Sequence, residues 1–367
     1  MQIAVDAMQS HLPLASVGLV QRELVRELCR LDTSHTFSIL TTVKTGLDVP
    51  KSGSVRVIEL GPGGLFSWRR NVRRRLERDP PDVFLATFNI SPRVPPRTRL
   101  LLLSMDLSHG REDLSLPSLT LGQFYRYWHL RSIRRADSLI ALSSHGADEL
   151  RKIVGRERPV HVVSLDCDRI YKETTRRTMD AINDGLGLPA APYFLYVGRL
   201  RPSYKNIGRL ISAFRAVRPE LPDHRLVMVH NDRPTIWQAY LAKNPASGIT
   251  LVRDIPTEAL SLLYRSACCL VYPSRYEGFG IPLLEAQNSD CPVIANRLPP
   301  MTEVAGHGAV YYDGSAPDLA RQMVRVARFS EAERRVVVDQ GRINAGRFGW
   351  SHTARQVLAC LEATART

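Results

Sequence analysis

The chain has 367 residues, a formal net charge of +14 at pH 7 and 44% hydrophobic residues. This length exceeds what a single hydrophobic core usually supports, so we expect two domains. The apolar content is ordinary for a globular protein, and the absence of any apolar run of eighteen residues argues against a transmembrane helix. The sequence starts with a strand-like segment and lacks the basic and then apolar pattern of a signal peptide.

The six cysteines show no metal-ligand spacing, and most of them lie in apolar stretches. We interpret them as reduced core thiols of a cytosolic protein. The positive charge suits nucleic acid, an anionic membrane surface or plain solvation. Because the sequence has no recognised nucleic-acid motif, nucleic acid is the least favoured of the three, and we expect no such partner. The distribution of arginines favours the membrane.

Residues 1–172 alternate strand-like and helix-like segments, as a doubly wound α/β domain does. A loop is predicted over 12–19, after the first strand, and it contains Gly18. Helices are predicted over 20–31 and 66–78. A further helix is predicted to end at residue 135, and another to begin at residue 144. Strands are predicted over 3–6, 37–41, 55–60, 83–87, 100–105, 138–142 and 160–165.

The predicted helix over 66–78 is strongly basic. Its apolar residues recur every four positions, and its arginines cover much of the remaining surface: Trp68, Val72 and Leu76 against Arg69, Arg70, Arg73 and Arg74. This composition is typical of a helix that lies on an anionic membrane. The alternative is a helix that packs through its Trp68 stripe and leaves its arginines in solvent. We expect the membrane or a lipid-linked acceptor to contact this helix.

Residues 173–192 are polar and contain glycines and prolines, which predicts a linker. The strand and helix pattern then restarts, so a second domain is predicted over 193–349. Its strands are expected at 193–197, 225–230, 249–252, 268–273, 291–296 and 310–312. Helices are expected at 206–217, 235–244, 258–267, 316–329 and 331–346, and a final helix runs from 350 to 367.

The segment 274–286 stands between a buried strand and a helix. Gly278 and Gly280 let the backbone approach a ligand and expose N–H groups at the start of a helix, which favours an anion site. Pro282 suits a first helical turn. Glu277 and Glu285 can flank a bound phosphate ester and accept hydrogen bonds from hydroxyl groups.

This segment resembles the E-x7-E signature of retaining glycosyltransferases with the GT-B fold, family 4. Two further motifs follow the same family order: residues 196–200 with Lys205-Asn206 before the segment, and residues 291–296 with 303–306 after it. Several motifs in the right order are more specific than a lone Gly-rich turn. The resemblance implies two Rossmann-like domains that face each other across a cleft, with the final helix crossing back onto the first.

The resemblance also implies a donor site in the second domain. Arg199 and Lys205, with Asn206, would hold the nucleotide diphosphate, since fixed cations stabilise the charge that develops on this leaving group. In the first domain, Gly18 is what remains of the family's Gly-rich phosphate loop, because Ser16 stands where a second glycine is usual.

By the same resemblance, Glu277 contacts the transferred sugar and Glu285 binds the ribose hydroxyls. Backbone groups near the start of the helix contribute as well, from Gly278, Phe279, Gly280 and Ile281. The loop with Arg253 and Ile255 receives the base through backbone groups. No Asp-x-Asp motif with metal-ligand character occurs, so we expect no metal and no other cofactor.

The first domain departs from the family at one expected catalytic position. The family often has a His-Asp pair after the strand at 100–104, whereas this chain has Met105-Asp106. His109 lies three residues later and could substitute, although a loop histidine is more often an ordinary surface residue. Asp106 could orient the acceptor hydroxyl or act as a base.

The predicted function is therefore a retaining, metal-independent glycosyltransferase for a polysaccharide or lipid-linked glycan, located in the cytoplasm or at the cytoplasmic face of the inner membrane. Residues 291–306 look most like bacterial mannosyl- and rhamnosyltransferases of surface polysaccharides, so GDP-mannose is the first donor expected. A UDP- or TDP-sugar is the next. A partner-dependent homologue that binds the nucleotide sugar without transferring it remains an alternative, because of Met105.

Overall fold

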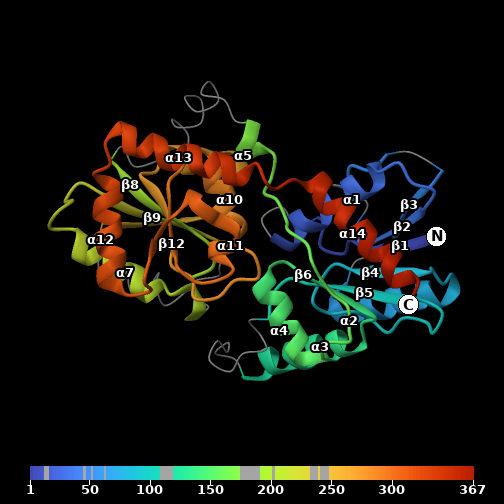
Figure 1. Ribbon diagram of the computed structural model, residues 1–367. Coiled ribbons are helices and arrows are strands. Elements are labelled where there is room, and N and C mark those ends of the chain that lie inside the picture. Colours follow the sequence, from blue (N-terminus) through green and yellow to red (C-terminus); the bar gives the residue numbers. More distant parts are fainter. Residues whose placement is uncertain are drawn as a thin grey trace. The chain divides into compact units, whose positions relative to one another are not determined.

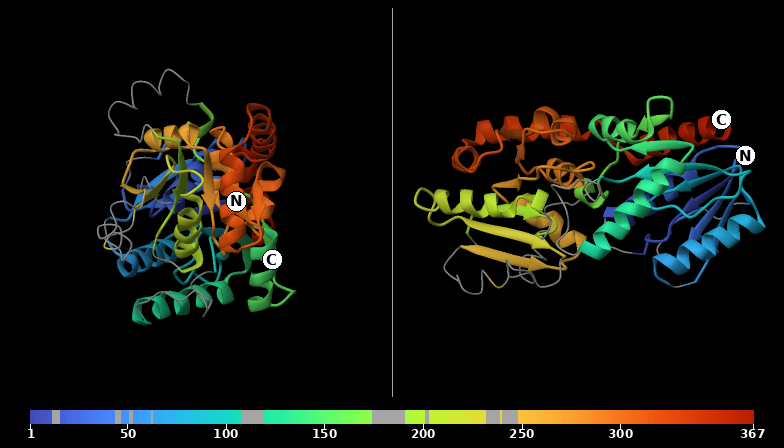
Figure 2. Two further views of the ribbon diagram at one scale, coloured as in Figure 1. Left: turned by 90° about the vertical axis from the view of Figure 1, so that its left-hand side faces the viewer. Right: turned by 90° about the horizontal axis from the view of Figure 1, so that it is seen from below.

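The computed structural model describes residues 1–11, 16–43, 47–50, 53–61, 63–107, 119–173, 191–200, 203–231, 239 and 248–367. They form two compact units, shown in Figures 1 and 2: Met1–Asp166 with Phe348–Thr367, and Cys167–Arg347. The predicted helix over 235–244 and most of the predicted linker lie outside the described residues. Among those described, no helix combines the length and the apolar character that crossing a membrane requires.

The first unit is built on a seven-stranded sheet in the order β3-β2-β1-β4-β5-β6-β7. Every neighbouring pair is parallel. The strands are β1 (Gln2–Asp6), β2 (Thr36–Thr41), β3 (Val55–Glu59), β4 (Val83–Ala86), β5 (Arg99–Ser104), β6 (Ser138–Ala141) and β7 (Val160–Val162). The chain runs outward from β1 to one edge and then returns to β4, so the switch point lies between β1 and β4.

The helices that cover this sheet among the described residues are α1 (Ser16–Arg30), α2 (Leu65–Arg78), α3 (Leu119–Arg135), α4 (Ser144–Val154) and α14 (Trp350–Ala365). Figure 1 shows α1 and α14 on one face and α2, α3 and α4 on the other. Helix α1 connects strands toward one edge of the sheet, and α2, α3 and α4 connect strands toward the other edge. Right-handed connections in opposite directions place their helices on opposite faces. The last helix, α14, packs against α1, β4 and β5. Its buried side chains recur every three or four residues and include Trp350, Ala354, Val357 and Leu361.

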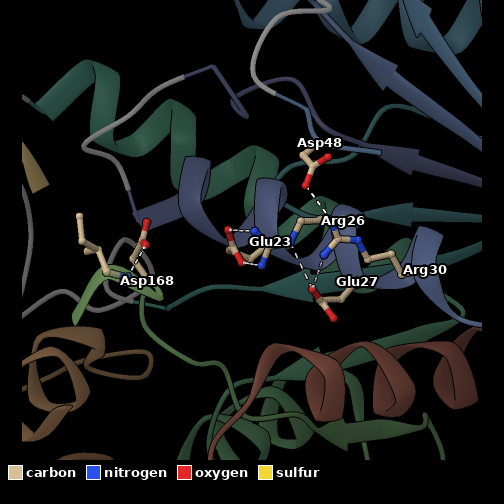
Figure 3. Close-up of polar contacts among 7 residues, drawn as sticks. Glu23, Arg26, Glu27, Arg30, Asp48 and Asp168 are labelled. Carbon is tan, nitrogen blue, oxygen red and sulfur yellow. Dashed lines mark hydrogen bonds and ion pairs between the residues drawn. The ribbon is translucent and has the colours of Figure 1, made fainter. Parts of the chain in front are cut away.

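Helix α1 begins at Ser16, so the predicted loop over 12–19 was wrong from that residue on. Gly18 consequently lies in the first turn of a helix, where it is buried, because the apolar stripe of the helix extends back to Leu19 and Val20. Figure 3 shows a chain of ion pairs along the same helix, formed by Glu23, Arg26, Glu27, Arg30 and, from outside it, Asp48.

The second unit contains a six-stranded sheet in the order β10-β9-β8-β11-β12-β13, again parallel throughout. Its strands are β8 (Tyr193–Val197), β9 (Arg225–His230), β10 (Ile249–Arg253), β11 (Cys269–Tyr272), β12 (Val293–Asn296) and β13 (Val310–Tyr312). The chain fills the edge on the β10 side first and then returns to β11. The switch point therefore lies between β8 and β11.

Helices also surround this sheet: α5 (Ile170–Glu173), α7 (Ile207–Val217), α9 (Thr257–Ser266), α10 (Ile281–Asn288), α11 (Met301–Ala305), α12 (Ala316–Ala327) and α13 (Glu331–Ala345). Helices α7 and α12 pack together. Their apolar stripes join those of β8 and β9 in one core, which includes Phe194, Phe214, Met228 and Leu319. The prediction of two doubly wound parallel-sheet units is confirmed.

The boundary between the units lies at Asp166, before the predicted limit at residue 172. Residues 167–173 belong to the second unit because α5 packs there. The ring of Tyr171 lies edge-on to that of Tyr264, with centroids 5.7 Å apart, and Arg265 donates a hydrogen bond to the Tyr171 carbonyl. Asp168 accepts a hydrogen bond from the backbone N–H of Ile170 at the start of α5, drawn in Figure 3.

Candidate active site

Two loops of the second unit meet at its switch point, and they carry several of the predicted site residues. One loop follows β8 and the other follows β11. Lys205 Nζ lies 2.6 Å from Glu277 Oε1. Hydrogen bonds to backbone carbonyls tie the loops together: the side-chain Nδ2 of Asn206 donates to the Pro273 carbonyl, and the Arg275 N–H donates to the Tyr204 carbonyl. Ligands of open α/β sheets bind at this kind of crevice.

Lys205 is enclosed by aromatic rings as well as by Glu277. Its ammonium nitrogen lies 5.6 Å from the ring centroid of Tyr204 and 5.5 Å from that of Tyr272, within range of cation–π attraction. Burial, followed by the charge and hydrogen bond of Glu277, holds the pKa of Tyr272 well above its ordinary value. The phenol is therefore protonated and donates to Glu277. The sequence did not single out either tyrosine, although Tyr272 ends the buried strand.

The predicted turn between strand and helix is present. Strand β11 ends at Tyr272 and α10 begins at Ile281. Between them, Gly280 has φ 106° and ψ 49°, a left-handed conformation that favours glycine. A Cβ atom there would also lie 3.0 Å from a methyl group of Leu283. No side chain caps the start of α10 at Gly280, so the first backbone N–H groups of this helix lack a side-chain cap.

Glu285 lies in a different environment from Glu277. It is buried in α10, and Oε2 accepts a hydrogen bond of 2.7 Å from the hydroxyl of Tyr264. Burial raises its pKa to about 7, while hydrogen bonds from Tyr264 and Tyr171 act in the opposite direction. This carboxyl group can therefore change protonation state near neutral pH. The tyrosine partners were not predicted, because neither lies near Glu285 in the sequence.

The remaining predicted donor residues lie at strand ends of the same sheet. Arg199 is exposed directly after β8, and its carbonyl accepts a hydrogen bond of 2.8 Å from the hydroxyl of Tyr196. Arg253 ends β10, the edge strand, and forms an exposed ion pair of 2.9 Å with Asp254. Ile255 follows and is half-buried. The structure brings Lys205 into contact with Glu277 and Asn206 into contact with Pro273 on the same loop, and it shows no contact of Arg253 with them among the described residues.

In the first unit, Asp106 follows β5 and is half-buried. The N–H of Met105 donates a hydrogen bond of 2.7 Å to Asn89 Oδ1, which joins this loop to the loop after β4. Burial, followed by the negative charge of Asp106, holds the pKa of Tyr125 far above its usual range. A carboxylate and a protonated phenol are thus neighbours here. His109, the other predicted catalytic residue, lies outside the described residues.

A cavity of about 440 Å³ opens next to these groups, at the carboxyl ends of β1 and β2. Its described lining contains no Asp, Glu, Lys or Arg, and it includes Met8, Gln9, Thr42, Phe88 and Tyr125. Tyr125 comes from α3, whereas the others come from loops after three different strands. The sequence could not predict this cavity, because its walls come from segments far apart in the chain.

Asp6 ends β1, two residues before Met8 in the lining of this cavity. It is fully buried; Oδ1 accepts a hydrogen bond of 3.0 Å from the Met8 N–H, and Oδ2 has no partner among the described residues. Burial raises its pKa to about 7. Thr87 donates to the Asp6 carbonyl, Gln21 donates to Thr87, and Gln21 accepts from the Gln9 N–H. This network fixes the segment that lines the cavity.

The prediction that Trp68 contacts a membrane was wrong. Trp68 is 2% exposed and packs in the core of the first unit with Val72 and Leu76. The helical spacing of these residues suits a protein core as well as a membrane, and the sheet beside α2 supplies the core. Arg69 is half-buried and lies over the ring of Trp128, 3.7 Å from its centroid. Arg70, Arg73 and Arg74 are exposed.

Comparison with known proteins matches part of the chain to a family. Residues 181–338 match the model of the family "Glycosyl transferases group 1". The O-antigen chain mannosyltransferase B of Escherichia coli is 28% identical over 170 residues, which are 45% of this chain and 44% of the relative. The O-antigen chain mannosyltransferase RfbU of Salmonella typhimurium is 44% identical over 120 residues, 32% of this chain and 33% of the relative. The matched regions thus span less than half of these two curated relatives.

Solved structures match nearly the whole chain. A sucrose-phosphate synthase from Thermosynechococcus elongatus has a TM-score of 0.76 at 18% identity. The match covers 99% of this chain and 98% of the synthase. The Anabaena protein HepE, solved with UDP-glucose, has a TM-score of 0.73 at 14% identity, with 99% of this chain and all of HepE covered. The chain has the GT-B fold, and the segment that matches the group 1 glycosyl transferase model lies in its second unit. The predicted fold is confirmed.

Proposed function

We propose that the chain is a glycosyltransferase that moves a hexosyl group from a nucleotide sugar to a polysaccharide or lipid-linked glycan. The observation that carries the proposal is the Lys205–Glu277 pair at the switch point, within the segment that matches the group 1 family. Mannose from GDP-mannose is the first donor, because the matched relatives are named mannosyltransferases of O-antigen chains. A UDP- or TDP-sugar is the second, since HepE was solved with UDP-glucose.

Lys205 and Arg199 would hold the diphosphate of the donor. The leaving group gains negative charge as the glycosidic bond breaks, and fixed cations in a partly enclosed site stabilise that charge. Lys205 is already oriented by Glu277 and two aromatic rings, so little reorganisation is needed when the phosphate arrives. The N–H groups at the start of α10 would bind further oxygens of the donor.

Glu277 and Glu285 would take different parts of the same donor. Glu277 would accept hydrogen bonds from the hydroxyl groups of the transferred sugar, and Glu285 those of the ribose. The hydrogen bonds from Tyr264 and Tyr171 stabilise the charged form of Glu285, against the effect of its burial. A charged carboxylate is the stronger acceptor for hydroxyl groups.

The cavity of the first unit would receive the acceptor. Asp106 and Tyr125 would orient the acceptor hydroxyl. The described lining of the cavity contains no Asp, Glu, Lys or Arg, which suits a neutral sugar. We propose front-side attack, in which the acceptor hydroxyl approaches the face that the diphosphate leaves and a phosphate oxygen takes its proton. The configuration at the anomeric carbon is then retained, without a covalent intermediate or a metal.

The experiment that tests this function is transfer from radiolabelled GDP-mannose, UDP-glucose and TDP-rhamnose to a bacterial membrane extract, with and without EDTA. The proposal predicts labelled product from one nucleotide class, unchanged by EDTA. Donor binding without any labelled product would favour the non-catalytic homologue. Salt-sensitive binding to duplex or single-stranded nucleic acid, with no nucleotide-sugar binding, would instead contradict a glycosyltransferase.

We also propose that the exposed arginines of α2 bring the protein to the cytoplasmic face of an anionic membrane. These side chains, Arg70, Arg73 and Arg74, are exposed to solvent. Trp68, in contrast, is buried in the core and is not available to a membrane. Replacing all three with glutamine should reduce co-sedimentation with vesicles that contain phosphatidylglycerol. Unchanged co-sedimentation would show that this face is merely solvated.

A further inference from the structure

Helices α2 and α3 lie side by side on one face of the first unit (Figure 1), and aromatic residues join them. The ring centroids of Phe66 and Phe124 are 5.4 Å apart, and those of Phe124 and Trp128 are 6.0 Å apart. Two aromatic side chains of this surface are exposed, Phe66 at 66% and Tyr127 at 56%. Exposed aromatic residues of this size on a folded surface often mark a binding site.

Four arginines gather beside these rings, and we call them the arginine cluster: Arg69 from α2, Arg93 from the loop after β4, and Arg131 and Arg135 from α3. None of the four has a carboxylate within ion-pair distance in the part of the chain that the structure describes. Other arginines of α2 differ, because Arg73 pairs with Glu77 and Arg75 with Asp79. The cluster is therefore a concentration of positive charge without its counter-charge.

Some donors of the cluster are buried and unused. Arg69 Nε and Arg135 Nη1 are inaccessible to solvent and have no acceptor among the described residues. The other nitrogens of Arg135 fix the side chain in place: Nε donates to the Arg131 carbonyl at 3.2 Å, and Nη2 donates to the Ser91 carbonyl at 3.1 Å. Because solvent does not reach these two nitrogens, a ligand would contact the cluster through its accessible groups, the exposed Arg93 and the half-buried Arg131.

The charges of the cluster act on one another. Burial, followed by the positive charges of Arg69, Arg131 and Arg93, lowers the pKa of Arg135 to about 10. Burial and the charge of Arg131 also lower the pKa of Arg69. With a pKa of about 10, Arg135 is still protonated at pH 7, so it adds its charge to those of the neighbouring arginines. An anion bound among them would relieve this repulsion.

We propose that the arginine cluster is a binding site for a phosphate or diphosphate group, separate from the donor site of the second unit. Guanidinium groups match the geometry of phosphate oxygens and bind them through paired hydrogen bonds. A dianionic group also balances more of the cluster charge than a single carboxylate could. The exposed rings of Phe66 and Tyr127 would contact the apolar body to which the phosphate is attached.

The test is isothermal titration with pyrophosphate and with dihexanoyl phosphatidic acid. All proteins carry Arg199→Ala and Lys205→Ala, so that phosphate binding in the second unit does not contribute. In this background, Arg131→Gln/Arg135→Gln should weaken binding at least about tenfold, the loss expected for two charge-assisted contacts. The matched control, Lys152→Gln/Arg156→Gln, removes the same charge from exposed positions in and just after α4 and should bind as the parent does. If Arg135→Gln disturbs folding, Arg69→Gln/Arg93→Gln serves as the second cluster variant.

Equal weakening by the control and the cluster variants would show diffuse charge attraction and would overturn the site. Absence of binding by the parent would overturn it as well. A third titration, with glycerol 3-phosphate, separates the two sources of the phosphate when it is compared with dihexanoyl phosphatidic acid. A lipid source predicts tighter binding of dihexanoyl phosphatidic acid than of glycerol 3-phosphate, and Phe66→Ala/Tyr127→Ala should abolish that difference. A soluble source predicts equal binding of the two. Because these measurements use no sugar donor, they are independent of the transfer reaction.

Discussion

The switch point of the second unit holds a preformed ion pair, whereas that of the first unit opens into a cavity whose described lining carries no formal charge. The ion pair lies between β8 and β11, and the cavity lies at the carboxyl ends of β1 and β2, with Phe88 from the loop after β4 in its lining. The difference matches their proposed ligands. A diphosphate calls for fixed cations, and an acceptor sugar calls for neutral hydrogen-bonding groups and apolar walls.

Each crevice also has a buried carboxyl group with a pKa raised to about 7. Glu285 receives hydrogen bonds from two tyrosines, while Asp6 keeps one oxygen without a partner among the described residues. We therefore interpret Glu285 as a group kept ready for a ligand and Asp6 as a group that shapes the loop above it. The predictions below test whether the two crevices divide the work in this way.

The largest effect is expected at Lys205. Lys205→Ala should lower kcat/KM about 10²- to 10³-fold, the loss typical when one group that stabilises developing negative charge is removed. It should also leave Glu277 without its ion-pair partner. Steady-state kinetics with the preferred donor measure this. The control is Arg335→Gln, which removes a positive charge from an exposed position of the same unit. Similar kinetics for the two variants would contradict a diphosphate contact.

A smaller effect is expected from Tyr264→Phe, which removes the hydroxyl that donates to Glu285. Losing a buried hydrogen bond to this carboxyl should lower the free energy of unfolding by about 1–3 kcal/mol and raise the KM for the donor. Tyr193→Phe is the matched control, since it removes a buried hydroxyl that donates to the Leu263 carbonyl at 2.8 Å, away from Glu285. We expect the KM for the donor to change in Tyr264→Phe and not in Tyr193→Phe. The same KM in both variants would mean that the Tyr264 hydroxyl contributes only to stability.

Asp6 gives a prediction about pH. Its pKa is about 7 in the folded state against 3.8 for the ordinary side chain, so the folded protein binds more protons than the unfolded chain between these values. The free energy of unfolding must then fall as pH rises through this window. Asp6→Asn should flatten that fall and be the more stable protein at pH 8, by on the order of a few kcal/mol. Denaturant unfolding at pH 5 and pH 8 measures both slopes, and an identical slope in the variant would refute the assignment.

The smallest effect concerns Met105, where the family often has histidine. If the chain is a homologue that binds the nucleotide sugar without transferring it, Met105→His should raise transfer activity severalfold. The N–H of this residue is already held by Asn89 Oδ1, so the new side chain starts from a fixed backbone. A loss of activity would indicate that this chain orients its acceptor by other groups, such as Asp106 and Tyr125. Transfer assays with equal amounts of folded protein distinguish these outcomes.

The sequence predicted the fold well because the buried strands are short apolar runs, such as Leu100–Leu103, that are too short for a typical helix and alternate with amphipathic helical segments. It predicted the turn from Tyr272 to Ile281 for a similar reason, since glycines and a proline define that turn. It failed where the answer depends on tertiary contacts. The Trp68 stripe has the same spacing in a core and on a membrane, and the partners of Glu285 and the arginine cluster come from separate parts of the chain.

The central claim is that the second unit binds a nucleotide diphosphate at Lys205 and Arg199. A thermal-shift panel of GDP, UDP, TDP and ADP and their common sugars, without metal and with EDTA, tests it most directly, since a ligand that binds the native state raises the unfolding midpoint. We expect a shift with one nucleotide class, and its loss when Arg199 and Lys205 are both replaced by alanine. No shift with any nucleotide, or an equal shift in the double variant, would contradict the claim.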